Sequence, residues 1–249
     1  MKYLITLICL AIATIGRGQD QDNFDKATTL YQKGDYTQAA AVYSSILKSG
    51  KESSALYYNL GNTYYKLNNV PESIYYYEKA LQLDPENADA KNNLIFANQM
   101  KVDAITPLPK TWVRQLSDGI VGLFSAHTWA VLSIIGVFAF VLSFLLYYFV
   151  ERTALKRTFF SLMLVFLFFA IGSYTLAHLC HKQVSQTQYA ILFDKTVRVF
   201  SDANAYSSEV MQLHEGTKVE IIEDAKDWVK IRLVNGKTGW TKVNSLRKL

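Results

Sequence analysis

Two long apolar segments, separated by a short charged turn, dominate the pattern of hydrophobic and polar positions. Residues 119–150 contain no Asp, Glu, Lys or Arg, and the same is true of residues 158–179. About 20 consecutive apolar residues cross the hydrocarbon core of a bilayer as a helix. A core helix of a soluble protein is seldom so long and so uniformly apolar. The sequence therefore predicts transmembrane helices over residues 127–150 and 158–180.

The turn between these segments, residues 151–157, predicts their orientation. It carries Arg152, Lys156 and Arg157 against the single acid Glu151. Short loops rich in Lys and Arg remain in the cytoplasm. We therefore expect a cytoplasmic turn, with both flanking parts of the chain on the opposite side of the membrane.

The first 18 residues have the pattern of a secretory signal peptide. Lys2 supplies a positive start, residues 3–15 an apolar core, and residues 16–18 a small-residue end. Cleavage near Gly18 and retention as an anchor both remain open. Either outcome exports the segment that follows, in agreement with the orientation expected from the turn.

Residues 23–100 contain an internal repeat with a period of 34. Ala27 in the first unit corresponds to Gly61 in the second, and Tyr43 corresponds to Tyr77. Small residues let two helices approach and aromatic residues fill the remaining space, so each unit is expected to be a helix pair that buries its apolar face against a neighbour. We predict a repeat domain over residues 19–100, with repeats at about 20–53 and 54–87 and one following helix.

The second unit resembles the tetratricopeptide repeat family. The positions that carry the resemblance are Tyr57, Leu60, Gly61, Tyr64, Tyr77, Ala80 and Pro85. The first unit keeps Gly34, Tyr36, Ala39 and Tyr43 but has Lys51 where the closing proline would stand. About three repeats are usually needed for independent stability. We therefore expect this domain to be stabilised by packing against a partner, against a copy of itself or against the membrane-proximal helix.

The resemblance to tetratricopeptide repeats also implies a binding surface. In that family the inner face of the first helix of each pair binds peptides or partner proteins. On this chain the implied protein-binding residues are Thr28, Tyr31, Tyr58, Asn62, Tyr65, Lys66 and Asn92. For each of them, a solvated position or a position in helix packing is the alternative.

Residues 101–126 connect the repeats to the first apolar segment. Pro107 and Pro109 favour an extended linker. After them, Trp112, Leu116 and Ile120 recur at helical spacing among polar residues, which predicts an amphipathic helix at the surface of the lipid bilayer. Residues 181–188 are expected to form the second linker.

Residues 189–249 change to the alternating pattern of short strands. Asn235-Gly236 between two such strands is a strong hairpin signal. The segment resembles the bacterial SH3-like domain in Glu215-Gly216-Thr217, Trp228 and the run from Asn235 to Trp240. Trp228 and Trp240 are candidates for a ligand groove, with a packing role as the alternative. The first loop lacks the Gly-Pro of some relatives, which weakens an expectation of cell-wall peptide binding.

The charge distribution and the lack of catalytic motifs argue against several functions. The formal charge of +5 is not clustered, because residues 19–101 carry eight lysines against ten acids and residues 186–249 carry ten basic against eight acidic residues. This distribution does not predict nucleic-acid binding. His127, His178 and His181, with Cys180, suggest a metal or redox site, but their spacing matches no specific one. We expect no metal, no cofactor and no enzymatic activity.

The predicted fold class is a multidomain membrane protein with an all-α helical repeat module, a two-helix transmembrane hairpin and a small all-β SH3-like barrel. This order of parts resembles the BatE-type proteins of the Bacteroides aerotolerance operon. The apolar segments, the basic turn and the leader predict an inner (cytoplasmic) membrane location with both terminal domains in the periplasm. The resemblance implies other Bat-type membrane proteins, which contain von Willebrand A-type domains, as partners, and an envelope role in stress or oxygen tolerance.

Three functions follow as hypotheses from these parts. The favoured one is a non-enzymatic scaffold that uses both exported modules for protein–protein interaction. The alternatives are a tether or sensor that binds peptidoglycan and, less favoured, a metal or redox protein. The direct partner and the oligomeric state stay open.

Overall fold

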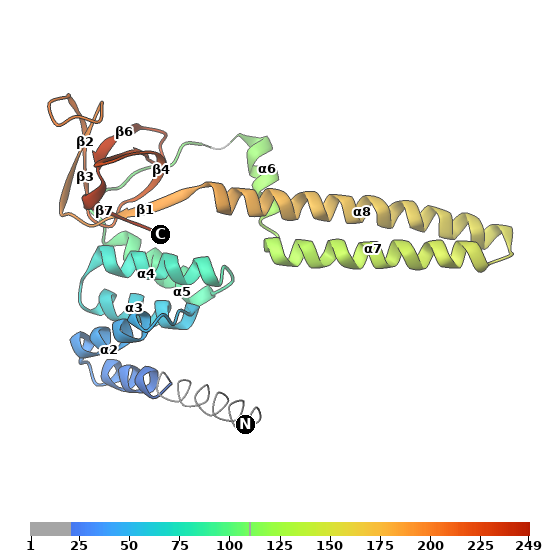
Figure 1. The fold of residues 1–249 in the computed structure, drawn as a ribbon, viewed down its shortest axis with the longest axis horizontal. Helices are drawn as coiled ribbons and strands as arrows, with labels where there is room; N and C mark the ends of the chain where they lie inside the picture. The colour runs from blue at the N-terminus through green and yellow to red at the C-terminus, as the bar shows by residue number, and fades with distance from the viewer. Residues whose placement is uncertain (1–20, 110) are drawn as a thin grey trace, which may run out of the picture. The chain divides into compact units, whose positions relative to one another are not determined.

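The computed structural model describes residues 21–109 and 111–249, except for the side chains of Arg114, Asp118 and residues 183–186. The predicted signal peptide lies outside the described residues. The chain divides into two compact units. One unit comprises the helical residues up to Pro107 together with Gln188–Leu249, and the other comprises Leu108–Thr187. The helical N-terminal part, the two apolar helices and the C-terminal antiparallel sheet (Figure 1) confirm the predicted fold class.

The N-terminal part, which we call the helical module, consists of successive antiparallel helices. They are residues 21–32, α2 (Tyr36–Lys48), α3 (Ser54–Lys66), α4 (Val70–Leu83) and α5 (Ala88–Gln99). Four helices begin behind side-chain caps that accept a backbone N–H bond three residues later, and these caps are Asp35, Ser53, Asn69 and Asn87. Such caps satisfy N–H groups that have no partner within the helix.

The 34-residue period reappears in the backbone and in the packing of the helical module. Gly34 and Asn68 occupy equivalent turns, and both have positive φ, +83° and +57°. Tyr43 and Tyr77 are each 1% exposed, and the small residues Ala27 and Gly61 are also buried. The expected pairing of small and large residues therefore forms the core between helices.

The C-terminal residues 188–249 form one antiparallel sheet with a short 3₁₀ helix, which we call the β-domain. Its strands are β1 (Gln188–Leu192), β2 (Thr196–Phe200), β3 (Glu209–His214), β4 (Lys218–Ala225), β5 (Trp228–Arg232), β6 (Thr238–Lys242) and β7 (Leu246–Lys248), with η1 (Val243–Ser245) before β7. The strand order is β3-β2-β6-β5-β4-β1-β7.

Alternation along the strands separates the two faces of this sheet. Val199, Val229 and Ile231 are at most 1% exposed and belong to one apolar core. The predicted hairpin at Asn235-Gly236 joins β5 and β6, with Gly236 at φ +82°. Strands β1, β3 and β7 were not predicted individually from the sequence.

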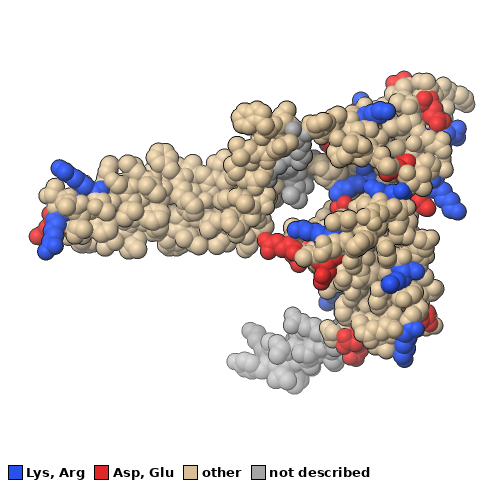
Figure 2. Space-filling model, turned by 180° about the vertical axis from the view of Figure 1, so that it is seen from behind, with Lys and Arg blue, Asp and Glu red and all other residues tan. Residues whose placement is uncertain are grey.

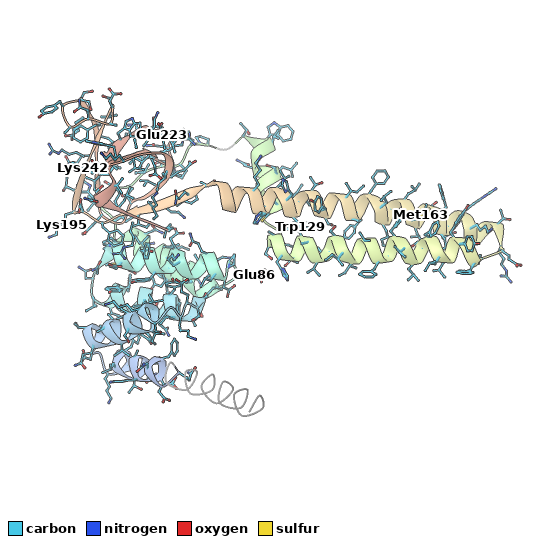
Figure 3. The ribbon with its side chains drawn as sticks, in the orientation of Figure 1. Glu86, Trp129, Met163, Lys195, Glu223 and Lys242 are labelled. Atoms are coloured by element: carbon cyan, nitrogen blue, oxygen red, sulfur yellow. The ribbon has the colours of Figure 1, made fainter. Side chains whose placement is uncertain are left out.

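The second unit contains three helices, α6 (Trp112–Val121), α7 (Ala126–Phe149) and α8 (Thr153–Gln186). In α7 and α8, the most apolar stretches are only 17% and 11% buried. A core helix would be mostly buried, whereas large apolar side chains project outward here (Figure 3). Both helices are long and apolar enough to cross a membrane. Figure 2 shows charged side chains gathered at the turn end of the pair and absent along most of its length.

Close contacts hold α7 and α8 together within the second unit. A Cβ at Gly136 would lie 3.0 Å from the Phe169 ring and 3.1 Å from the Ala170 Cβ. The Ser133 hydroxyl donates a 3.0 Å hydrogen bond to the Ala170 carbonyl oxygen. Small residues of this kind allow close approach of apolar helices. Helix α8 also extends beyond the predicted residues 158–180 at both ends. At its N-terminal end, Ala154, Leu155 and Lys156 are good helix formers.

The helical module and the β-domain contact one another within the first compact unit. Helix α4 packs against β1, and Ile191 of β1 joins the same apolar cluster as Ile74 and Tyr77 of α4. The expected support for the repeats was a partner, a second copy or the membrane-proximal helix. In the structure the β-domain of the same chain provides packing against the last helices of the array.

Candidate functional site

The inner face of the helical module carries two groups of hydrogen bonds between polar side chains, one in each repeat, which together we call the inner-face ladder. The Thr28 and Tyr43 hydroxyls lie 2.9 Å apart. In the second repeat, the Tyr77 hydroxyl donates to the Asn62 side-chain oxygen at 2.6 Å. The side-chain nitrogen of Asn93 donates to that same oxygen at 2.8 Å and to the Tyr58 hydroxyl at 3.3 Å. Asn62 of α3 and Asn93 of α5, which are 31 residues apart in sequence, thus share one polar network with Tyr77 of α4.

The ladder explains the position of several predicted binding residues. Asn62 accepts a hydrogen bond from the hydroxyl of the buried Tyr77, so its side chain supports the fold of the repeat. Burial raises the pKa of Tyr77. Burial also raises the pKa of Tyr43, and hydrogen bonds with Thr28 and Asn59 partly offset this rise. These tyrosines stay protonated at neutral pH and act as neutral donors and acceptors.

The remaining aromatic residues of the inner face are half-buried. Tyr31 packs edge-on against Tyr36 with ring centroids 5.3 Å apart. Tyr58 and Tyr65 pack against the cluster that contains Ile74 and Tyr77. The hydroxyls of Tyr31 and Tyr65 make no hydrogen bond to any residue that the structure describes. They are therefore available to a bound peptide, as amphipathic rings with a polar tip.

Two of the predicted binding residues are fully on the surface. Lys66 is exposed in the last turn of α3. Asn92 is exposed on α5 and takes no part in the ladder, whereas its neighbour Asn93 does. Sequence reasoning missed Asn93. A signal was present, because Asn59 and Asn93 are one 34-residue period apart and contact Tyr43 and Tyr77, which are also one period apart.

The two candidate tryptophans of the β-domain lie on the same sheet face. Trp228 pairs with Lys242, and Trp240 pairs with Lys230, between the adjacent strands β5 and β6. Trp228 packs edge-on against Phe200 at a centroid distance of 5.6 Å. The Lys230 ammonium lies 5.7 Å from the centre of the Trp240 ring. Both indoles are half-buried, so each has a packing contact and an accessible part.

Trp228, but not Trp240, lines a pocket of about 520 Å³. Three segments meet there, namely the loop after β2, the turn between β4 and β5, and η1. Lys242, labelled in Figure 3, reaches it from the end of β6. The polar lining residues are Asn204, Lys226, Asp227, Lys242 and Asn244. An indole beside amides and charges of both signs suits a polar ligand with some flat or apolar surface.

The histidines and the cysteine considered for a metal site lie in the second unit. His127 is in the first turn of α7, and His178, Cys180 and His181 are on α8. Within residues 21–109 and 111–249, no group of three or more His, Cys, Asp or Glu side chains is placed to hold a metal ion.

Comparison with known protein families agrees with this geometry. Residues 24–88 match the family described as Tetratricopeptide repeat, and residues 195–245 match the Bacterial SH3 domain. No curated protein matches the chain. The chain thus combines a tetratricopeptide repeat in its helical module and a bacterial SH3 domain in its β-domain with two apolar helices between them. Both domain types indicate interaction with other macromolecules.

Proposed function

We propose that this protein is a non-enzymatic scaffold of the inner membrane that captures another protein through the inner face of its helical module. The observation that carries the proposal is the inner-face ladder, flanked by the half-buried rings of Tyr31 and Tyr65. The ladder holds the face in one arrangement, and a rigid site loses little conformational entropy on binding. The Tyr31 and Tyr65 hydroxyls and the Lys66 ammonium then supply hydrogen bonds to an extended peptide.

The proposed location is a two-span membrane anchor with both terminal domains in the periplasm. The outward-facing apolar side chains of α7 and α8 support lipid contact. The basic residues at the turn end support a cytoplasmic turn. The apolar start of the sequence supports export of the helical module. In this arrangement the two family-matched domains face partners outside the cytoplasm.

The order of parts, which resembles that of BatE-type proteins, supports a role in an envelope complex. The partners proposed on this basis are Bat-type membrane proteins with von Willebrand A-type domains, in a complex for aerotolerance or stress. The proposal involves no catalytic residue and no cofactor.

Affinity capture from detergent-solubilised membranes tests the scaffold proposal. The full-length protein is compared with a variant that carries Tyr31→Phe, Tyr65→Phe and Lys66→Glu, which keeps both rings and removes the proposed contacts. The control is Lys48→Glu, an exposed lysine in the last turn of α2, as Lys66 is in the last turn of α3. We expect a defined set of membrane proteins with the wild type and the control, and loss of that set with the triple variant. Equal capture by all three proteins would contradict the proposal.

The Trp228 pocket favours cell-wall binding as a second candidate function. Co-sedimentation of the full-length protein with purified peptidoglycan measures it. Trp228→Leu should abolish sedimentation, whereas Trp240→Leu, on the same sheet face but outside the pocket, should retain it. Absence of wild-type sedimentation would leave the scaffold as the supported function.

A further inference from the structure

The last helices of the repeat array have an apolar face that another part of this chain covers. In repeat proteins a terminal unit exposes the surface that a following unit would bury, and a cap is required there. Ile74 of α4 is nevertheless only 1% exposed, and Ile191 of β1 is fully buried. Both belong to one cluster that includes Tyr77 and Ala97. The cover is therefore supplied by β1 of the β-domain.

The backbone of the turn between β3 and β4 lies close to side chains of α4. Gly216 in this turn has φ +81°, and a Cβ there would lie 3.0 Å from the Val70 side chain and 3.1 Å from the Ile74 side chain. The left-handed conformation favours glycine, and the close approach leaves little room for a larger residue. Gly216 thus meets a local requirement of the turn and a packing requirement of the contact.

Charged side chains surround this apolar contact with matching signs. Arg247 of β7 donates two hydrogen bonds to the Glu72 carboxylate, at 2.8 and 2.9 Å. Its guanidinium also lies 4.0 Å from the centre of the Phe193 ring and 4.8 Å from that of Tyr75. Lys218 of β4 forms a 2.7 Å ion pair with Glu78 of α4. Paired, stacked guanidinium groups of this kind give directional as well as electrostatic recognition.

The segment that follows α5 forms hydrogen bonds with the turn between β3 and β4. The Asp103 carboxylate accepts hydrogen bonds from the His214 backbone N–H at 2.7 Å and from the Thr217 hydroxyl at 2.7 Å. The His214 ring nitrogen Nδ1 lies 2.8 Å from the other oxygen of Asp103. Two residues later, Ile105 packs against the core of the β-domain. Contact of the two modules is therefore apolar at its centre and polar at its rim, as in specific protein interfaces.

From these contacts we propose that the bacterial SH3 domain carries a second binding surface whose ligand is the last tetratricopeptide helix pair of the same chain. We call it the capping surface, and it consists of Ile191, Phe193, Gly216, Lys218 and Arg247. None of these residues lines the Trp228 pocket. The β-domain thus acts as the cap of the repeat array and keeps its ligand pocket free. This function is independent of the partner that the inner face captures.

Hydrogen exchange measured by mass spectrometry on the full-length protein in detergent tests the capping surface. Arg247→Glu places a negative charge against Glu72. Gly216→Val adds a branched side chain that would press on Val70 and Ile74. We expect exchange of the α4 and α5 amides to rise about tenfold or more in both variants, because these helices lose their cover. The β5 and β6 amides should stay protected, which verifies that the β-domain remains folded.

The matched control is Arg232→Glu, which breaks the ion pair with Glu220 inside the β-domain at a similar exposure. It should leave α4 and α5 exchange unchanged. The double variant Glu72→Arg with Arg247→Glu restores opposite charges and should restore protection. Unchanged α4 and α5 exchange in both single variants would overturn the proposal. An equal rise in the control, or a double variant with protected β5 and β6 but unprotected α4 and α5, would also overturn it.

Discussion

Tyr77 lies directly over Gly61, and a Cβ at that glycine would stand 2.6 Å from two carbons of the tyrosine ring. Tyr77 is 1% exposed, so its ring has no space into which to move. The contact joins α3 and α4 in the second repeat and carries the small-to-large pairing that the 34-residue period predicts. The glycine at this position is a packing requirement, since no positive φ is involved.

Gly61→Ala should therefore destabilise the helical module by about 1–3 kcal/mol through overpacking. Chemical unfolding of the full-length protein in detergent, monitored by hydrogen exchange of α3 and α4, measures this loss. Adding Tyr77→Leu makes room for the new methyl group, so the two substitutions should cost less together than the sum of each alone. Additive costs would contradict direct contact between these residues.

The helix pair of the second unit provides a prediction with an internal control. Gly136→Leu should separate α7 from α8, because even a Cβ there would press on Phe169 and Ala170. At Gly172 a Cβ meets nothing within 4 Å, so Gly172→Leu should be tolerated. Thermal unfolding of both variants in detergent gives the comparison. Equal loss of stability would place these glycines in equivalent surroundings, contrary to the structure.

Asp103 should make stability depend on pH in the acid range. Burial alone would raise the pKa of this carboxyl, but hydrogen bonds from His214 and Thr217 and the nearby His214 charge outweigh it and lower the pKa. The unfolded value is about 3.9. A carboxyl with a lowered folded-state pKa stabilises the fold above the unfolded value, and this contribution is lost as the pH falls through the folded pKa.

Asp103→Asn removes this contribution. We expect a loss of about 1.5–3 kcal/mol near pH 7, the range for hydrogen bonds to charged groups. Denaturant titration at a series of pH values should show the difference between wild type and variant shrink below about pH 4, where the carboxyl of the unfolded state takes up its proton, and disappear as the pH falls through the lower folded-state pKa. A difference that persists undiminished at pH 2 would contradict the proposed role of the charge.

Two adjacent asparagines of α5 differ in their contacts, because Asn93 belongs to the inner-face ladder and Asn92 is exposed. Asn93→Ala removes the donor to Asn62 and Tyr58 and should cost about 0.5–1.5 kcal/mol. Asn92→Ala, at an exposed position, should change stability by less than about 0.5 kcal/mol. The same unfolding measurement applied to both variants distinguishes them. A larger loss of stability with Asn92→Ala than with Asn93→Ala would contradict the hydrogen bonds described for Asn93.

The sequence pattern was informative where a feature repeats or persists along the chain. Apolar run length predicted α7 and α8, and the correspondence of Ala27 with Gly61 predicted the helix pairs. Asn92 stays a predicted binding residue, whereas the hydrogen-bonded neighbour Asn93 was not predicted, because one residue on a helix is a rotation of about 100° and only the structure shows which side chain reaches Asn62. Strand β7 was missed because it has only three residues, and β1 was missed because its apolar residues, 189–192, are consecutive and do not alternate with polar ones. Their role depends on contact with α4 rather than on a pattern of their own.

The contact between modules could not be predicted for a related reason. Glu72 and Arg247 are 175 residues apart, and neither belongs to a repeating pattern. In the sequence, a glutamate in the first turn of a helix and an arginine near the end of the chain are each ordinary polar residues. Only the folded arrangement shows that they form one bidentate pair beside Phe193 and Tyr75.

The covered face of α4 also limits how this chain can change in length. Arrays of stacked repeats commonly differ between relatives in the number of units, since each added unit contacts only its neighbours. Here a unit inserted after α5 would occupy the place of β1 and the turn at Gly216. Growth of the array at this end would therefore require loss of the SH3 contact. The number of repeats before the β-domain is fixed by a surface that lies outside the repeats themselves.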